Sequence, residues 1–313
     1  MKNARRLTEG AVLLAIFAVL LLLNLYVPFL GLVVIWFLPL PFIYFSWKND
    51  WKGIIVFLVS SLALSMIVGS FLAIPMALLF GTTGIALGYL SQKNKSRTTI
   101  LMVASLVFLI NLLIQYGIAV AFFKFNFIEE ATTMLKKSFD MSSQILNSVG
   151  NDAEAAKLKE QLDAFIMMIN TLMPSMFVVS SLIFVFLLQL LNFPILKRFG
   201  MNVTHWMAFR DISLPKSILW YYLITVILSL ILKPEADSYL YIALSNLAYI
   251  LQIILIIQGL SFVYFVSHYK GWPKAIPVLV TVFLFLIPLV LYIIRILGII
   301  DLGFDLRKRL VKK

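Results

Sequence analysis

Long apolar runs recur along almost the whole chain, and this feature most restricts what the chain can fold into. A lipid-exposed backbone must satisfy its own hydrogen bonds, and these runs lack the residue-by-residue alternation of a membrane barrel. They therefore predict an all-α fold, a polytopic integral membrane helix bundle with eight or nine transmembrane helices. The apolar segments are 8–25, 29–46, 53–69, 71–90, 99–123, 173–195, 217–232, 240–266 and 276–300.

The positive charge of the chain lies in clusters between these runs. The net charge is +12, yet the cations do not form a soluble basic face, so we expect the lipid bilayer and no nucleic acid as a partner. The positive-inside rule predicts a plasma-membrane protein with a cytoplasmic N-terminus and an extracytoplasmic segment 124–172. The clusters are Lys2, Arg5 and Arg6; Lys93, Lys95 and Arg97; and Lys197, Arg198, Arg210 and Lys216.

The C-terminal tail conflicts with nine complete spans. Nine spans would place the basic tail "DLRKRLVKK" outside, whereas its cations favour the cytoplasm. One of the last three apolar segments is then re-entrant or interfacial, or the tail is external against the rule. The segment 217–232 is the shortest of the three, and we expect it not to cross fully.

These boundaries divide the chain into three parts. Residues 1–196 are predicted to form a six-helix membrane bundle, 197–216 a basic cytoplasmic loop, and 217–313 a C-terminal membrane part with two or three spans and the tail. Within the first part, 124–172 reads as an amphipathic helical hairpin with a stop at Gly150 and a second helix from Asn151, where Glu154 completes a capping-box pattern. The hairpin is either a lid over a substrate or a simple extension of spans five and six.

Side chains for catalysis are almost absent, and we expect no enzymatic activity and no cofactor. There is no cysteine, and His205 and His268 lie in loops without further ligands, so no metal site is expected. Arg295 alone is charged well within an apolar segment, near its end, where it can snorkel to the interface. Asp305 and Arg309 are four residues apart and predict a helix-surface ion pair.

Amide side chains supply most of the polarity inside the membrane. Asn111 and Gln115 share one face of span five, and Gln189 and Asn192 share one face of span six. Such amides either hold helices together by interhelical hydrogen bonds or line a cavity that binds a small neutral or zwitterionic solute. Three more amides, Asn246, Gln252 and Gln258, lie on span eight.

Two helices carry stripes of small residues. Span four has Ala77, Gly81, Gly84 and Gly88 on one face, which predicts close helix packing within the chain. Span one has Ala11, Ala15 and Ala18 at offsets of four and seven residues, and this smooth face suits either internal packing or a partner helix.

The run from Thr8 to Lys95 resembles the substrate-binding S-components of energy-coupling-factor transporters. The matching features are the alanines of span one, Pro39 and Pro41, and Pro75 followed by the glycines of span four and the basic exit "SQKNKSR". The resemblance implies that the first six helices form an S-component-like bundle. It also implies that Ala11, Ala15 and Ala18 dock on a transmembrane coupling subunit.

The whole chain, including the outer hairpin and "IIQGLSFVYFVSHYKGWPKAIPVL", is similar to the YybS-like family, polytopic membrane proteins of Gram-positive bacteria without an established activity. Two functional hypotheses follow. In the first, the protein is a solute-binding, transporter-type subunit that docks on a membrane partner. In the second, it is a non-transporting scaffold or regulator that acts through its basic cytoplasmic loop and tail.

Overall fold

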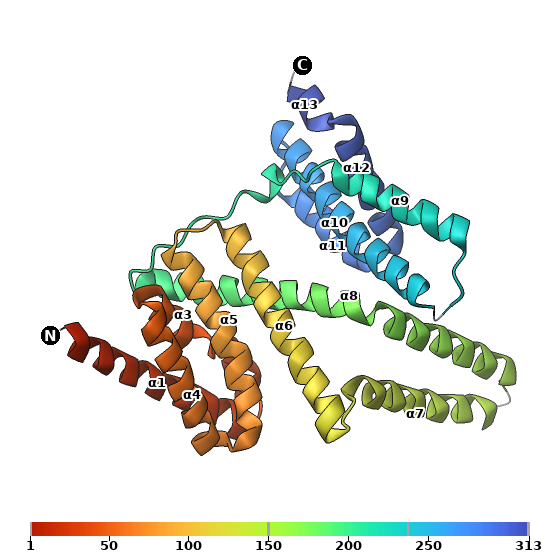
Figure 1. The fold of residues 1–313 in the computed structure, drawn as a ribbon. Coiled ribbons are helices and arrows are strands. Elements are labelled where there is room, and N and C mark those ends of the chain that lie inside the picture. The colour runs from red at the N-terminus through yellow and green to blue at the C-terminus, as the bar shows by residue number, and fades with distance from the viewer. Residues whose placement is uncertain (1, 149–150, 237, 312–313) are drawn as a thin grey trace. The chain divides into compact units, whose positions relative to one another are not determined.

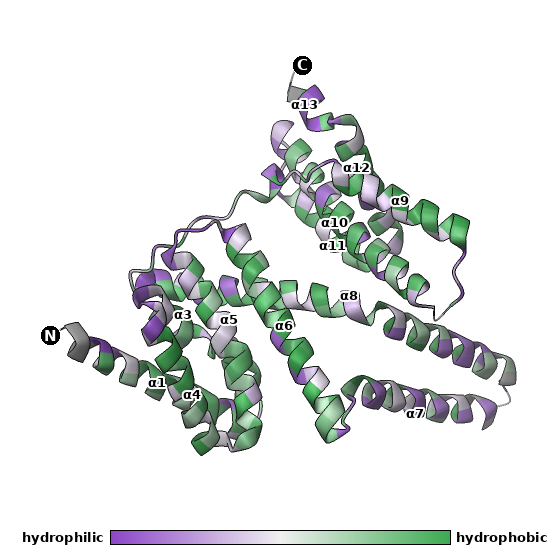
Figure 2. Cartoon of the chain, in the orientation of Figure 1, coloured by the Kyte–Doolittle hydropathy of each residue, from purple (hydrophilic) through white to green (hydrophobic). Residues whose placement is uncertain are grey.

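The computed structural model describes residues 2–148, 151–236 and 238–311, and every regular element in these ranges is a helix (Figure 1). Seven helical segments are long and apolar enough to cross a bilayer, and Figure 2 shows how strongly apolar residues dominate them. The prediction of a helical polytopic membrane protein is confirmed. The longer helices are α1 (Lys2–Tyr26), α3 (Leu40–Lys48), α4 (Trp51–Gly69), α5 (Ile74–Gln92), α6 (Arg97–Phe123), α7 (Phe127–Ser148), α8 (Asp152–Arg198), α9 (Ser217–Leu232), α10 (Tyr239–Tyr269), α11 (Ala275–Leu286) and α12 (Pro288–Phe304).

Two compact units make up the chain, and they differ from the expected division at residue 196. Unit 1 contains 1–135 and 177–206, and unit 2 contains 136–176 and 207–313. The start of the basic loop belongs to unit 1 because Met201 is buried there and Arg97 Nε donates to the Thr204 carbonyl at 2.9 Å. Most of the hairpin belongs to unit 2, where the Asn246 side chain accepts a hydrogen bond from the Ser175 backbone at 2.8 Å.

Unit 1 is built around aromatic side chains of α3. Phe42 is fully buried and meets Phe17 of α1 edge to face, with 5.0 Å between ring centroids. Leu13, Phe17 and Leu21 recur every four residues and turn one face of α1 inward. The segment 29–46 is not one helix, because the chain breaks between the short helix α2 (Leu30–Val34) and α3 at Pro39, which lacks a backbone donor.

The apolar segment 276–300 does not form one continuous helix. Helix α11 ends at Leu286, and Ile287 has an extended backbone before Pro288 opens α12. Proline cannot donate the next helical hydrogen bond and disfavours a helical residue before it, which explains the break. Helices of 12 and 17 residues are about 18 and 26 Å long, and each is shorter than a bilayer core of about 30 Å.

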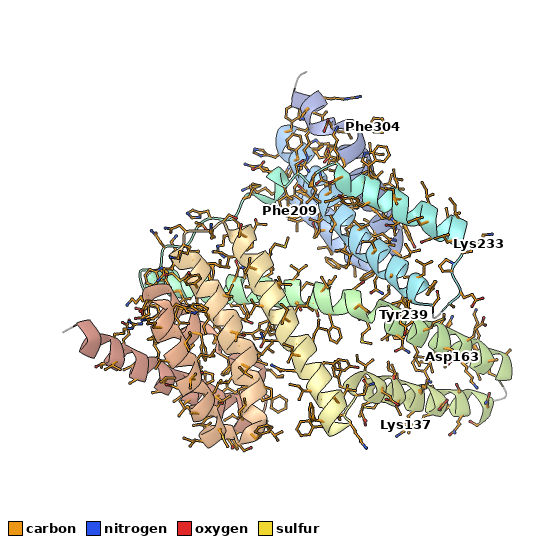
Figure 3. The ribbon with its side chains drawn as sticks, in the orientation of Figure 1. Lys137, Asp163, Phe209, Lys233, Tyr239 and Phe304 are labelled. Atoms are coloured by element: carbon orange, nitrogen blue, oxygen red, sulfur yellow. The ribbon has the colours of Figure 1, made fainter. Side chains whose placement is uncertain are left out.

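The two short helices run in opposite directions within unit 2. Helix α12 is parallel to α10, because Gln252 meets Arg295 and Gln258 meets Asp301. Helix α11 starts at the C-terminal end of α10 and runs back along it, with Tyr264 3.2 Å from Thr281 between hydroxyl oxygens. The start of α11 and the end of α12 therefore lie at the same end of unit 2, opposite Tyr239 (Figure 3). The segment 275–304 therefore begins and ends at the same end of unit 2.

The expected outer hairpin consists of α7 and the first part of α8. Helix α7 is separated from α6 at Lys124, which has a left-handed backbone, whereas α8 continues without a break for 47 residues. The second hairpin helix is thus a direct extension of span six. The Asn151 side-chain amide donates to the Glu154 carboxylate at its start, while the expected stop at Gly150 lies outside the described residues.

Candidate functional site in the polar interface of α10 and α12

Helices α10 and α12 cross at two facing glycines. A Cβ atom added to Gly298 would overlap the carbonyl oxygen of Leu255, and one added to Gly259 would overlap the carbonyl oxygen of Ile294. Both neighbours are backbone atoms, which cannot move aside by a change of rotamer. The two backbones therefore approach closely, and polar side chains on either side of the crossing can reach the opposite helix.

On the C-terminal side of this crossing lies a buried carboxylate. Asp301 accepts hydrogen bonds from Gln258 Nε2 at 2.6 Å and from Arg307 Nε at 2.9 Å, both at Oδ2. The side chain of Asp301 is 2% exposed and that of Arg307 is 14% exposed. Ion pairing and the amide hydrogen bond together offset the loss of hydration of this carboxylate.

The same arginine fixes the segment that precedes α9. Arg307 donates to the carbonyl of Arg210 at 2.9 Å and to the hydroxyl of Ser261 at 3.0 Å. The Ser261 hydroxyl in turn lies 2.8 Å from the carbonyls of Phe209 and Ile212, and Gln258 Oε1 accepts from the Leu214 backbone at 3.0 Å. Residues 209–214 and the start of the C-terminal tail are thus held together at one end of unit 2.

The expected surface ion pair between Asp305 and Arg309 is wrong. Asp305 has a positive φ of 50° and ends α12, so its carboxylate does not share a helix face with Arg309. It pairs instead with Lys216 Nζ at 2.6 Å, and the pKa of Asp305 is lowered from its usual value chiefly by this hydrogen bond. This contact also joins the tail to the segment before α9.

On the N-terminal side of the crossing lies Arg295. Its NH1 atom donates to Gln252 Oε1 at 2.7 Å, and its guanidinium carbon lies 4.9 Å from the ring centroid of Tyr292. In the structure Arg295 is the eighth residue of α12 and is bonded to the middle of α10. Its snorkelling to the interface stays a prediction.

A signal for this interface is present in the sequence. Gln252 and Gln258 are six residues apart, as are Arg295 and Asp301. Equal spacing on two helices is what a parallel pair requires if each amide is to meet a charged residue. The sequence does not give the relative directions of the two helices, so this spacing alone does not pair the residues.

The alanines of α1 do not pack inside the chain. Ala11 and Ala15 are exposed and Ala18 is half-buried, on the side of α1 away from Leu13 and Phe17. Ala11 also lines an apolar groove of about 550 Å³ between α1 and α4. Internal packing therefore does not explain Ala11 and Ala15.

The small residues of α5 lie in the interior. Ala77, Gly81, Gly84 and Gly88 are all buried. A Cβ atom at Gly84 would meet the Pro39 carbonyl, and one at Gly88 would meet the Ile43 carbonyl. Along this stripe α5 crosses α3.

The four candidate solute-binding amides differ in their hydrogen-bond partners. Asn111 donates to the Val107 carbonyl of its own helix, and Gln115 donates to the Pro75 carbonyl at 2.9 Å. Asn192 donates to the Trp36 and Leu188 carbonyls, both at 2.9 Å. Gln189 is fully buried, and neither its Nε2 nor its Oε1 has a hydrogen-bond partner among the described residues. No described hydrogen bond joins the Asn111/Gln115 pair to the Gln189/Asn192 pair.

The helices and their buried polar contacts define the class of this chain, a multi-pass helical membrane protein. The chain belongs to the family described as predicted membrane protein (DUF2232), whose model matches residues 15–302. It is 33% identical over 309 residues, 99% of each chain, to the uncharacterized protein YybS of Bacillus subtilis strain 168. No solved structure matches the chain, and its likeness to S-components stays a prediction.

Proposed function

We propose that this multi-pass membrane protein is a transporter-type subunit of the plasma membrane that docks on a second membrane protein along α1. The observation that carries the proposal is that Ala11 and Ala15 are exposed and that Ala11 lines an apolar groove. Small side chains let a partner helix approach closely, which increases van der Waals contact where lipid offers no hydrophobic driving force.

Two ion pairs fix the N-terminal end of α1, the helix that carries the alanine face. Arg6 pairs with Asp50, and Glu9 pairs with Lys48 at 2.6 Å. These ion pairs anchor α1 to the α3–α4 region, so the alanine face stays turned outward. In the proposed orientation this end is cytoplasmic and 124–172 is extracytoplasmic.

The solute of such a subunit is small and neutral or zwitterionic. Support comes from Gln189, whose amide is buried in unit 1 with two unpartnered polar atoms. A buried amide without partners costs free energy unless a ligand or water satisfies it. The role proposed here is binding, not catalysis.

The alanine face can be tested with a mild-detergent pull-down of the wild-type protein and of Ala11→Leu/Ala15→Leu. We expect a membrane protein to co-purify with the wild type and to be reduced at least about tenfold with the variant, because bulky side chains prevent close helix approach. The matched control is Ala121→Leu, which enlarges an exposed alanine of α6. Equal recovery of the same partner from all three proteins would rule out docking at this face.

The alternative, a scaffold or regulator, is favoured by a different observation. In unit 2 the turn after α10 meets the tail, since the Tyr269 hydroxyl donates to the Leu310 carbonyl at 2.7 Å. The exposed cations Lys270, Lys274, Lys308 and Arg309 lie in these two segments. Under this alternative, Lys308→Gln/Arg309→Gln loses an acidic soluble partner in the same pull-down, while Ala11→Leu/Ala15→Leu retains it.

A further inference from the structure

Arg295 lies at the depth of the middle of α10. Its partner Gln252 is two residues, about 3 Å, from the midpoint of the 31-residue helix α10. In a bilayer, this places a guanidinium group in the hydrocarbon core. A cation there costs about 2.5–3.5 kcal/mol by insertion measurements, so it is retained where it has a function or a partner.

In the part of unit 2 that the structure describes, no carboxylate lies at that depth. Of the 14 Asp and Glu residues, Asp301 alone lies on the apolar helices near Arg295. Its carboxylate is already bonded to Gln258 and Arg307, about 9 Å further along the helix. Within the apolar segments of the sequence the acidic residue is Glu9, which pairs with Lys48 in unit 1. No carboxylate among the described residues therefore compensates the charge of Arg295.

The free donors of Arg295 suit an oxyanion. NH1 is bonded to Gln252, while no acceptor is described for Nε or NH2, and the residue is half-buried rather than enclosed. The Tyr292 ring lies against the guanidinium and limits its movement. A planar guanidinium binds a carboxylate or phosphate through two parallel hydrogen bonds, with a fixed geometry that a lysine cannot provide.

We propose that Arg295, positioned by Gln252, binds the carboxylate or phosphate group of a ligand within the membrane. The ligand is either a small organic anion or an anionic lipid headgroup, which share this chemistry. The helix break at Ile287–Pro288 supports the proposal, because interrupted helices occur at solute and ion sites in transporters. The site is independent of the alanine face of α1.

The test uses the full chain purified in a phosphate-free maltoside detergent. Thermal unfolding is measured with inorganic phosphate, with acetate and with chloride at equal ionic strength, and native mass spectrometry detects retained phosphatidylglycerol. Arg295→Gln keeps a donor for Gln252 and removes the charge, and Arg295→Lys keeps the charge and removes the planar fork. Lys137→Gln, which removes an exposed cation from α7, is the control.

We expect phosphate or acetate to raise the melting temperature of the wild type above that in chloride. The apparent affinity should fall at least about tenfold in Arg295→Gln and less in Arg295→Lys, and should be unchanged in Lys137→Gln. Retention of phosphatidylglycerol by the wild type but not by Arg295→Gln, without an effect of free anions, would identify a lipid as the ligand. The proposal is overturned if the wild type responds to neither anion and retains no anionic lipid, or if Arg295→Gln binds as the wild type does. Should Arg295→Gln not fold, Arg295→Lys and the wild type alone still decide between these outcomes.

Discussion

Replacement of Gly298 by alanine is expected to destabilise unit 2 by about 3 kcal/mol, the upper end of the range for an overpacked core. The added methyl group would overlap the Leu255 carbonyl oxygen, so α10 and α12 must separate. Separation would also lengthen the hydrogen bonds between Gln258 and Asp301 and between Arg295 and Gln252. Thermal unfolding of the purified protein in detergent measures the loss.

The matched control is Gly303→Ala on the same helix. A Cβ atom at Gly303 would lie 3.5 Å from Leu219 Cδ2, which is an ordinary van der Waals distance. We expect its stability to change by less than about 0.5 kcal/mol. Equal behaviour of the two variants would contradict the close crossing of α10 and α12.

Removal of Arg307 is expected to have the largest effect among single charge changes. Arg307→Ala leaves the carboxylate of Asp301 buried without its cation, and breaking a buried ion pair in this way costs about 3–5 kcal/mol. The variant also frees the Arg210 carbonyl, so residues 207–216 should become more sensitive to limited proteolysis. Arg309→Ala, which removes an exposed cation two residues away, should change neither measurement.

A double variant separates charge from packing at this position. In Asp301→Asn/Arg307→Met the carboxylate is gone, an acceptor for Gln258 remains, and the methionine retains much of the apolar stem of the arginine. At least half of the stability lost in Arg307→Ala should return. If the double variant is as unstable as the single one, the uncompensated carboxylate is not the cause.

Local features of the sequence predicted the class and most helix positions. Runs of apolar residues give the length and place of each span, Pro39 accounts for the break within 29–46, and Asn151 with Glu154 marks the start of α8. Each of these depends on residues within a few positions of one another, which is what hydropathy and capping patterns report.

Partners distant in sequence could not be predicted in this way. Asp305 was assigned to Arg309 by helical spacing, whereas the helix ends at Asp305 and the carboxylate meets Lys216, 89 residues away. The hairpin was assigned to the first six helices, yet the hydrogen bond from the Asn246 side chain to the Thr171 carbonyl joins it to unit 2 across 75 residues. The presence of a proline did not locate the helix break either. Pro277 lies near the start of α11, where proline is tolerated, whereas Pro288 directly follows the break at Ile287.

Because α8 is one continuous helix, residues cannot be inserted into it without displacing buried side chains. Val185, Leu188, Phe193 and Leu196 all lie on this helix and in one core of unit 1. Each residue inserted between Leu188 and Phe193 would rotate everything beyond it by about 100°. One of the two pairs would then turn out of the core, whereas the irregular stretch 199–208 could absorb the same insertion. Related chains should therefore vary in length in that stretch and keep a constant number of residues between positions 188 and 193.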